Sequence, residues 1–347
     1  MKWILLAGML LPPLGWAADP ILATGRWVNN DGRYQTSWPG GMLSAQFTGT
    51  SVGVVLNDER SYYVVEIDGK AAQQISPASG KRTVWIKNLP AGTHRIDLIR
   101  RNESPDYVGQ VDGFVLDGGQ WQAAPEAPKR KIEFIGDSFT AALANLSTQR
   151  ECSEREIAAT TDASQGFAIK VARELNAQWQ VNAMSGMGMV RNWGGNLADR
   201  NFRTFYPRQL QTDANSKLDA QWLPQVVVIG LGTNDFSSKI NAGEKRNAEQ
   251  LEQDFLAAYR QLISQLNARY QQPQIILTAL KLWPDDQLRP LVKSLVTEAN
   301  TAGNTRLHYL ELSPMQLNGC QWHPNLQDHQ QVATQVLAKI KEIKPSW

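Results

Sequence analysis

The sequence is poor in cysteine and histidine, nearly balanced in charge, and without a long apolar run beyond its first residues. Its 347 residues include two cysteines and four histidines, and the formal net charge is +2. So small a charge gives no reason to expect nucleic acid or an anionic membrane surface as a partner. After residue 17 no apolar stretch approaches the roughly 20 residues that a membrane span requires. We therefore expect a protein that binds no nucleic acid and has no membrane span.

The first 17 residues have the pattern of a secretory signal. Lys2 supplies the positive start, Trp3 to Leu14 the apolar segment, and Gly15-Trp16-Ala17 a small-x-small cleavage site. The apolar segment is too short, and too interrupted by proline, to span a bilayer. We expect cleavage after Ala17 and a secreted or periplasmic protein.

The expected export indicates how the two cysteines are used. Cys152 and Cys320 would meet in an oxidising compartment, where paired thiols form disulfides. Cys152 follows Ser138 closely in the sequence, and Cys320 lies just before His323. A disulfide between the two cysteines would therefore fix the loop that carries His323. Two unlinked thiols in the core are the alternative.

Two parts of the chain differ in the periodicity of their apolar residues. From Ile21 to about Leu116 apolar residues alternate as in β-strands, and turn signals recur about every 10 residues, which is typical of a β-sandwich or jelly roll. A segment rich in glycine and proline follows. We expect an all-β jelly-roll or sandwich domain over residues 18–120 and a linker over residues 121–130, after the signal segment 1–17.

From Lys131 onward, short apolar strands alternate with amphipathic helices. Such an alternation predicts a parallel sheet with helices on both faces, and thus a three-layer α/β/α domain over residues 131–347. One long helix is expected over Asn247 to Tyr270. The expected strands are Ile132 to Ile135, Trp179 to Ala183, Val226 to Leu231, Ile275 to Leu280 and Leu307 to Leu312.

The stretch Lys131 to Thr140, K-I-E-F-I-G-D-S-F-T, holds the first candidate for catalysis. Gly136 breaks the apolar run, so Ser138 is expected at a strand-to-helix junction on the carboxyl edge of the sheet. There its hydroxyl can act as a nucleophile, while its own N–H points toward the same space and can help to hold an oxyanion. The alternative is a serine that caps the helix.

Polar residues follow other expected strands at the same edge. Asn182 to Gly186, Gly232 to Asp235 and His323-Pro324 each lie after a strand, and parallel sheets bind ligands beyond the carboxyl ends of their strands. His323 is the best candidate for the base that takes the proton of Ser138, because an imidazole accepts and returns protons near neutral pH. Structural roles are expected for the other histidines, His94, His308 and His329.

These four stretches resemble, in order, the four sequence blocks of the SGNH or GDSL-type hydrolases. The resemblance implies serine esterase chemistry, with Ser138 as nucleophile and His323 as base. It also implies an oxyanion hole made by the N–H groups of Ser138 and Gly186 and the side-chain amide of Asn234. For Asn234 the alternative is a turn asparagine.

The sequence departs from this family pattern at the third member of the triad. The family usually places an aspartate three residues before the histidine, where this chain has Cys320. The imidazole still needs an acceptor at Nδ1 to fix its tautomer, and the backbone carbonyl of Gln321 or Trp322 can serve. We therefore expect a Ser-His dyad, with Asp328 as a less favoured substitute. The dyad predicts little loss of turnover when Asp328 or Asp235 is neutralised.

The chain resembles the carbohydrate esterase family 2 enzymes in its order of parts, a strand-rich part followed by an SGNH part. It also resembles them in two motifs, S-G-M-G-M-V-R-N at the second block and C-Q-W-H-P at the last. The likeness covers nearly the whole mature chain. It implies removal of O-acetyl groups from plant polysaccharides such as xylan and glucomannan, by a protein without metal or cofactor. The loop residues Trp193, Trp283 and Trp322 suit a platform on which sugar rings stack.

Three other functions stay open on the sequence. A lipase or thioesterase of the same fold would need an extended apolar channel. A peptidoglycan O-acetylesterase would use the same chemistry in the same compartment. From a different class, the chain would be mainly a polysaccharide-binding module with a residual site.

Overall fold

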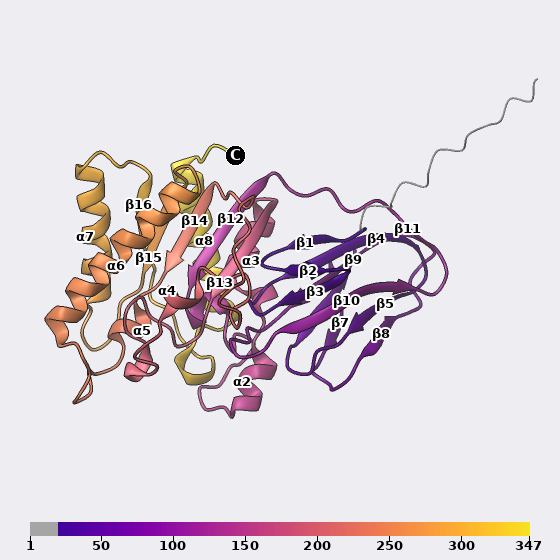
Figure 1. Cartoon of the computed structure of the whole chain (residues 1–347), viewed down its shortest axis with the longest axis horizontal. Helices are drawn as coiled ribbons and strands as arrows, with labels where there is room; N and C mark the ends of the chain where they lie inside the picture. The colour runs from indigo at the N-terminus through magenta and orange to yellow at the C-terminus, as the bar shows by residue number, and fades with distance from the viewer. Residues whose placement is uncertain (1–19) are drawn as a thin grey trace, which may run out of the picture.

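The structure is a computed structural model in which residues 20–347 are described. The expected signal segment and its cleavage site lie outside the described residues. Within this range the strands form three sheets, arranged in two parts that lie side by side (Figure 1). Sheets A and B are antiparallel and pack into a β-sandwich, whereas sheet C is parallel and is covered by helices. The predicted fold class, an all-β part followed by an α/β/α hydrolase part, is confirmed.

The β-sandwich forms because alternate residues of its strands are apolar and point between the two sheets. In β4, for example, Leu43, Ala45 and Phe47 are fully buried. Sheet A has the order β1-β4-β9-β6-β7 with β11 paired to β4, and sheet B has the order β2-β3-β10-β5-β8. The strands are β1 (Leu22–Thr24), β2 (Val28–Asn30), β3 (Arg33–Thr36), β4 (Met42–Gly49), β5 (Val52–Leu56), β6 (Tyr63–Ile67), β7 (Lys70–Ile75), β8 (Arg82–Ile86), β9 (Gly92–Arg100), β10 (Gly109–Leu116) and β11 (Gln120–Trp121).

The segment expected as a linker begins inside sheet A. Strand β11 pairs with β4, and the ring of Trp121 packs edge-on against Phe47 at 6.2 Å between centroids. Trp121 is held there because its apolar ring packs against the core of the sandwich. The chain then runs without helix or strand from residue 122 to residue 129.

Sheet C has the order β13-β12-β14-β15-β16, so the strand that precedes Ser138 is flanked on both sides. Strands β14 and β15 are nearly continuous apolar runs, as expected where helices cover both faces of a sheet, whereas β12 and β13 also bury the polar side chains of Glu133, Gln180 and Asn182. Each of the five strands expected after residue 131 is present, with ends displaced by no more than two residues. They are β12 (Arg130–Gly136), β13 (Ala177–Ala183), β14 (Val226–Gly230), β15 (Gln274–Ala279) and β16 (Leu307–Glu311).

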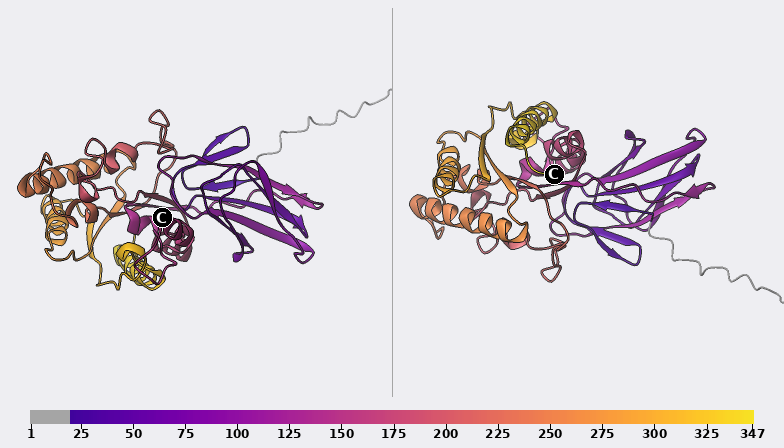
Figure 2. Two further views of the ribbon diagram at one scale, coloured as in Figure 1. Left: turned by 90° about the horizontal axis from the view of Figure 1, so that it is seen from below. Right: turned by 90° about the horizontal axis from the view of Figure 1, so that it is seen from above.

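Helices α3 and α8 cover one face of sheet C, and α6 and α7 cover the other (Figure 2). Helix α6 matches the expected long helix: Asn247 caps it, and its buried residues recur every three to four positions. The helices are α1 (Ser138–Ala141), α2 (Glu154–Thr160), α3 (Phe167–Glu174), α4 (Phe202–Phe205), α5 (Thr233–Phe236), α6 (Ala248–Arg269), α7 (Leu288–Thr301) and α8 (Leu326–Ile343), with short 3-10 helices η1 (Ala163–Gln165), η2 (Trp193–Gly195) and η3 (Cys320–Trp322).

The two parts share buried contacts. Met42, Val64 and Ile99 of sheet A belong to the apolar core under α3 and α8. The fully buried guanidinium of Arg26 lies 3.4 Å from the carboxylate of Glu133 on β12. The sandwich is thus packed firmly against sheet C. Within residues 20–347 no helix is both long enough and apolar enough to cross a lipid bilayer.

Candidate active site

Ser138 lies at the carboxyl end of the central strand β12, as the sequence predicts. Asp137, not Ser138, caps helix α1: its carboxylate accepts the N–H of Phe139 at 3.0 Å. The hydroxyl of Ser138 is therefore not used as a cap. Gly136 is required before it, because a Cβ there would lie 2.0 Å from Oγ1 of Thr140. The short helix can thus fold back tightly over the end of the strand.

His323 faces Ser138 although 185 residues separate them. Nε2 of the imidazole lies 2.8 Å from Oγ of Ser138, and Nδ1 lies 2.9 Å from the carbonyl oxygen of Cys320. A carbonyl only accepts hydrogen bonds, so Nδ1 carries the proton and Nε2 is free to accept one from the serine. Burial lowers the pKa of His323, while hydrogen bonds to the carbonyls of Cys320 and Gln321 act in the opposite direction. The net lowering of the pKa keeps the ring neutral, so that Nε2 can accept a proton.

The carbonyl that lies 2.9 Å from Nδ1 of His323 belongs to Cys320. The sequence offered the carbonyls of Gln321 and Trp322 for this role, and that of Gln321 also acts on the ring. Gln321 and Trp322 both adopt the left-handed backbone conformation, with φ of 53° and 58°. This tight turn brings His323 back over Cys320, and the N–H of Gly319 donates to the carbonyl of His323 at 2.9 Å. Non-glycine residues rarely adopt this conformation, so the sequence did not indicate the turn.

The predicted disulfide between Cys152 and Cys320 is present, with 5.6 Å between the Cα atoms. It holds the same residue whose carbonyl orients His323. Arg150 braces the loop as well: its carbonyl accepts the N–H of Gln321 at 2.7 Å, and its guanidinium donates to the carbonyls of Gln316 and Leu317. The segment from Arg150 to Cys152 therefore fixes the loop that carries His323.

Gly186 follows β13 and adopts a left-handed conformation with φ of 76°. Its carbonyl accepts the N–H of Trp193 at 3.0 Å, and its own N–H makes no hydrogen bond with any residue between 20 and 347. The N–H of Ser138 is the first of helix α1 and has no acceptor within the helix. Both N–H groups expected in the oxyanion hole are therefore available to a ligand.

The amide of Asn234 is buried at the start of α5. Its Nδ2 donates to the carbonyl of Met187 at 2.9 Å and, over a longer 3.3 Å, to Oδ2 of Asp137. The amide thus connects the first, second and third sequence blocks. In this state, both of its protons have acceptors within the protein.

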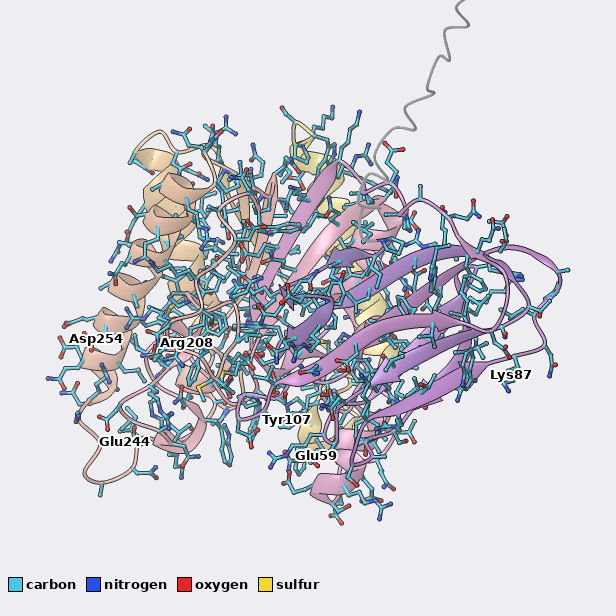
Figure 3. The ribbon with its side chains drawn as sticks, turned by 45° about the vertical axis from the view of Figure 1, so that its right-hand side comes forward. Glu59, Lys87, Tyr107, Arg208, Glu244 and Asp254 are labelled. Carbon is cyan, nitrogen blue, oxygen red and sulfur yellow. A yellow bond between two sulfur atoms is a disulfide. The ribbon has the colours of Figure 1, made fainter. Side chains whose placement is uncertain are left out.

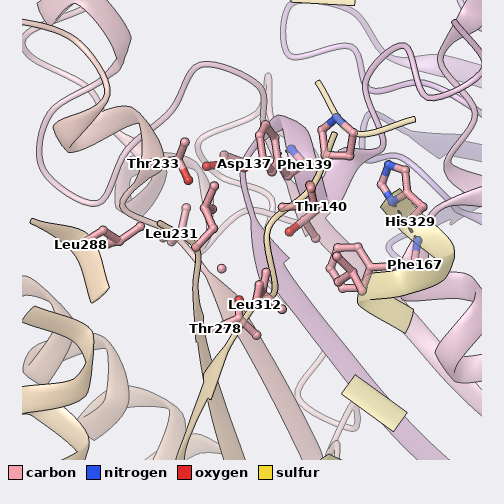
Figure 4. Close-up of a pocket in the computed structure, with 15 residues that line it drawn as sticks. Asp137, Phe139, Thr140, Phe167, Leu231, Thr233, Thr278, Leu288, Leu312 and His329 are labelled. Carbon is pink, nitrogen blue, oxygen red and sulfur yellow. Dashed lines mark hydrogen bonds between the residues drawn. The ribbon is translucent and has the colours of Figure 1, made fainter. Parts of the chain in front are cut away.

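Asp137 borders a small cavity of about 30 Å³, beside Thr140 and Thr233 (Figure 4). Because the carboxylate is buried there, its pKa rises to about 7; the hydrogen bond from Phe139 lowers the pKa and the nearby charge of Asp235 raises it. Asp137 therefore changes its charge near neutral pH while in contact with Asn234.

Asp235 has a role that the sequence did not suggest. Its carboxylate accepts the N–H groups of Met189, Val190 and Arg191 at 2.8 to 2.9 Å, and so holds the loop after Gly186. Burial raises the pKa of Asp235, and these hydrogen bonds oppose the shift. We therefore revise the expectation that neutralising Asp235 changes turnover little, because the change would disturb this loop.

Asp328 does not orient His323. Its carboxylate accepts the N–H groups of Gln316 and Leu317 at 2.9 and 3.0 Å, and closes a capping box with Asn325 at the start of α8. The remaining histidines also bond elsewhere. His94 bonds to Asp68 and Pro90, His308 to Gln274, and His329 accepts the N–H of Phe167.

The tryptophans expected to bind sugar are strongly exposed. The exposed fractions are 56% for Trp193, 85% for Trp283 and 59% for Trp322. Trp193 is hydrogen-bonded to Gly186, Trp322 immediately precedes His323, and Trp283 lies in the loop after β15. Flat indole faces are thus available at the same edge of sheet C as Ser138.

A serine at the carboxyl edge of a parallel sheet, a histidine that faces it and available N–H donors define a serine hydrolase of the GDSL type. Residues 134–331 match the model of the GDSL-like lipase/acylhydrolase family, and residues 23–125 match the model described as carbohydrate esterase 2 N-terminal. The chain belongs to carbohydrate esterase family 2 and is a carboxylic ester hydrolase.

The chain is similar to three relatives over nearly their whole length. An acetylxylan esterase / glucomannan deacetylase of Cellvibrio japonicus is 32% identical over 354 residues, covering 99% of this chain and 98% of the relative. A family two carbohydrate esterase from Clostridium thermocellum, solved in complex with cellohexaose, has a TM-score of 0.83 at 29% identity and covers 93% of this chain and 98% of its own. A family two carbohydrate esterase from Cellvibrio japonicus has a TM-score of 0.82 at 26% identity, covering 94% and 96%.

Proposed function

We propose that this enzyme removes O-acetyl groups from plant polysaccharides, such as acetylated xylan and glucomannan, through an acetyl-serine intermediate. The observation that carries the proposal is the 2.8 Å contact between Ser138 and a His323 whose other nitrogen is fixed by a carbonyl. Exposed tryptophans in loops at the same edge of sheet C support a sugar polymer as substrate, since indole faces offer flat apolar area for sugar rings. The acetylxylan esterase relative supports the same substrate class.

In the first half-reaction, Oγ of Ser138 attacks the carbonyl carbon of the acetyl ester while its proton passes to Nε2 of His323. The N–H groups of Ser138 and Gly186 and the amide of Asn234 donate to the oxyanion. When the tetrahedral intermediate collapses, the bond to the sugar oxygen breaks and His323 gives its proton to that oxygen. Acetyl-Ser138 and a free sugar hydroxyl remain.

In the second half-reaction, water attacks acetyl-Ser138 while His323 takes one proton of the water. Collapse of the second intermediate releases acetic acid and restores the serine hydroxyl. Throughout, Nδ1–H donates to the carbonyl of Cys320, which stabilises the imidazolium without itself titrating. No carboxylate is needed for this purpose.

Asn234 donates to the oxyanion by giving up its longer contact. The 2.9 Å bond to Met187 fixes the amide, while the 3.3 Å contact to Asp137 is the weaker of the two and is exchanged for the oxyanion. Each donor of this kind contributes about 3 to 4 kcal/mol to stabilisation of the transition state.

The disulfide indicates that the enzyme matures outside the cytoplasm. We propose that it is secreted or periplasmic and that the signal segment 1–17 is removed. The mature chain then comprises a β-sandwich domain over residues 18–120, a linker over residues 121–130 and a hydrolase domain over residues 131–347. The amino-terminal sequence of the exported protein tests the cleavage site.

Acetate release from a panel of substrates tests the proposed function. We expect release from acetylated xylan or glucomannan and rapid turnover of p-nitrophenyl acetate. Rates that rise with the length of the acyl chain would indicate a lipase-like enzyme. Preference for O-acetylated peptidoglycan over both plant polymers would also refute the proposed substrate.

The same edge of the sheet supports a second candidate function, retention of the polysaccharide itself. The three exposed tryptophans can hold a sugar chain whether or not it carries acetyl groups, and the Clostridium thermocellum relative was solved with cellohexaose bound. Affinity of a Ser138→Ala variant for cellulose or mannan, measured beside the esterase activity of the unchanged enzyme, separates binding from catalysis.

A further inference from the structure

A loop of the β-sandwich reaches the loop that carries Gly186. The loop over residues 101–108 connects β9 to β10, and the carboxylate of its Glu103 accepts the N–H of Ser185, with Oε1 at 2.9 Å and Oε2 at 3.1 Å. Ser185 immediately precedes Gly186. A carboxylate from the all-β part is therefore one residue away from an N–H expected in the oxyanion hole.

The residues on either side of Glu103 are hydrogen-bonded to the two parts of the protein. On one side, Arg101 donates to the carbonyls of Ala159 and Thr161 in the α/β part at 2.7 and 3.2 Å. On the other, the N–H of Ser104 donates to the carbonyl of Ser37 in the sandwich at 3.0 Å. The loop is therefore fixed to both parts of the protein around Glu103.

Side chains close the outer end of the loop. Asn102 accepts the N–H of Tyr62 at 2.8 Å, and the hydroxyl of Tyr107 accepts the N–H of Glu59 at 3.3 Å. Figure 3 shows Tyr107 and Glu59 near the boundary between the sandwich and the α/β part. Glu103 thus reaches Ser185 from a rigid support.

The carboxylate of Glu103 is only partly exposed to solvent. Burial raises its pKa to about 7, while the hydrogen bonds from Ser185 and the charge of Arg100 on β9 lower it. The guanidinium of Arg100 bonds to the carbonyl of Thr36 and the hydroxyl of Ser104. A carboxylate with so little hydration accepts a hydrogen bond from a backbone N–H strongly.

The contact between Glu103 and Ser185 bears on the direction in which the N–H of Gly186 points. The N–H of Ser185 is fixed by Glu103, the carbonyl of Gly186 is fixed by Trp193, and the N–H of Gly186 lies between these two anchors. Glycine populates many backbone conformations, so without an anchor on the Ser185 side the intervening peptide group is free to rotate. An oxyanion donor is effective only when it already points at the place where charge develops.

We propose that Glu103 is a positioning residue for catalysis, whose carboxylate fixes the Ser185–Gly186 peptide so that the N–H of Gly186 points at the oxyanion. The β-sandwich then fixes the direction of an oxyanion donor in addition to packing against the hydrolase part. The proposal rests on the proposed esterase reaction at Ser138.

Three variants test the proposal with p-nitrophenyl acetate, whose leaving group makes no sugar contacts. Glu103→Met keeps the approximate shape of the side chain but has no strong acceptor. We expect kcat to fall about 10- to 100-fold, with KM within about twofold. This loss is smaller than the roughly 10²- to 10³-fold loss that follows when an oxyanion donor is removed entirely. Glu103→Gln retains an acceptor oxygen, and we expect kcat within about threefold of the unchanged enzyme. Asp106→Asn is the matched control, because it neutralises an exposed carboxylate of the same loop that pairs with Arg60, and we expect no change.

A second measurement separates positioning from folding. The rate at which diethyl p-nitrophenyl phosphate inactivates Ser138 depends on the same donors, and we expect it to fall in Glu103→Met in proportion to kcat. An unchanged kcat in Glu103→Met, with or without a lower unfolding midpoint, would overturn the proposal. So would a Glu103→Gln variant that loses as much as Glu103→Met.

Failure of the proposed substrate is a separate result. If the unchanged enzyme hydrolyses p-nitrophenyl acetate but none of the acetylated polymers, the substrate assignment fails while the comparison of Glu103 variants stands. Should Glu103→Met not fold, Glu103→Ala takes its place in the same comparison with Glu103→Gln, and the same outcomes decide.

Discussion

At the scale of single residues, the site depends on a main-chain carbonyl where related hydrolases use a carboxylate. The carbonyl of Cys320 fixes the tautomer of His323 as an aspartate would. It differs from an aspartate because it has no charge to lose at low pH. The pH dependence of the reaction therefore reflects the histidine and the buried acids around it.

The first prediction concerns the dyad itself. Ser138→Ala and His323→Ala should each lower kcat on p-nitrophenyl acetate by several orders of magnitude, and by similar amounts, because the two residues act as a unit. Asp328→Asn should keep kcat within about tenfold, although it weakens hydrogen bonds to Gln316 and Leu317 and so lowers stability. A Ser138→Ala variant with a tenth of the activity would refute the nucleophile, and an Asp328→Asn variant as inactive as His323→Ala would indicate a triad.

The second prediction concerns the acid limb of the pH profile. Only the neutral ring of His323 can accept the proton of Ser138, and burial lowers its pKa from the ordinary 6.5. The kcat/KM should therefore fall about tenfold per pH unit only below pH 6.5. Protonation of Asp137 and Glu103, whose pKa values are both about 7, adds at most a shallow step above that limb. A steep limb centred above pH 7.5 would contradict the assignment.

At the scale of elements, the sequence predicted sheet C well because its strands are short segments with buried apolar residues that alternate with amphipathic helices. Ser138, Gly186, Asn234 and His323 were placed correctly at strand ends for the same reason. The turn at Gln321 was missed because a left-handed conformation at a non-glycine residue leaves no signal in the sequence.

Contacts between distant segments were also missed. Glu103 is 82 residues from Ser185 and lies in the other part of the protein, and the pattern of its neighbours gives no indication of that pairing. Asp235 was recognised as part of a motif, but its three bonds to the loop after Gly186 depend on how two loops pack. Periodicity predicts elements, whereas such packing depends on the whole fold.

The third prediction concerns the contact between α8 and α3. His329 is buried, stacks on Phe167 and accepts its N–H at 3.1 Å, and burial lowers the pKa of His329 to about 3. Between pH 6.5 and about 3 the unfolded chain binds a proton at this residue that the folded protein does not, so stability is lost as pH falls through this window. His329 alone should reduce the free energy of unfolding by about 2 kcal/mol between pH 7 and pH 5.

Urea unfolding at pH 7 and pH 5 measures this effect. His329→Asn keeps an acceptor near the position of Nδ1 but cannot titrate, so the difference between the two pH values should be smaller in the variant by about that amount. Its stability at pH 7 will be lower because the stacking on Phe167 is lost. An equal pH dependence in both proteins would show that His329 is not responsible.

At the scale of the whole molecule, the two parts are joined by a buried ion pair as well as by apolar contacts. Arg26 of the sandwich and Glu133 of β12 are both fully buried, and the guanidinium also donates to the carbonyl of Tyr206 at 2.7 Å. Such a pair adds little net stability, but the loss of one partner leaves a buried charge uncompensated. The joint between the parts is therefore sensitive to changes on either side.

The fourth prediction follows from this ion pair. Arg26→Met should lower the free energy of unfolding by about 3 to 5 kcal/mol, and adding Glu133→Gln should recover part of the loss. Arg260→Met is the matched control, since its partner Glu298 is exposed, and it should cost less than about 1 kcal/mol. Denaturant unfolding of the four proteins, including the unchanged enzyme, measures the differences. Equal losses in Arg26→Met and Arg260→Met would contradict the role of the buried pair.

The link between Cys152 and Cys320 also bears on when the enzyme becomes active during its biogenesis. A newly synthesised chain in a reducing compartment has two separate thiols, and its histidine loop is then held by Arg150 without the covalent bond. The disulfide adds a covalent anchor at the residue whose carbonyl orients the imidazole. Full turnover should therefore be reached only after the two thiols have been oxidised.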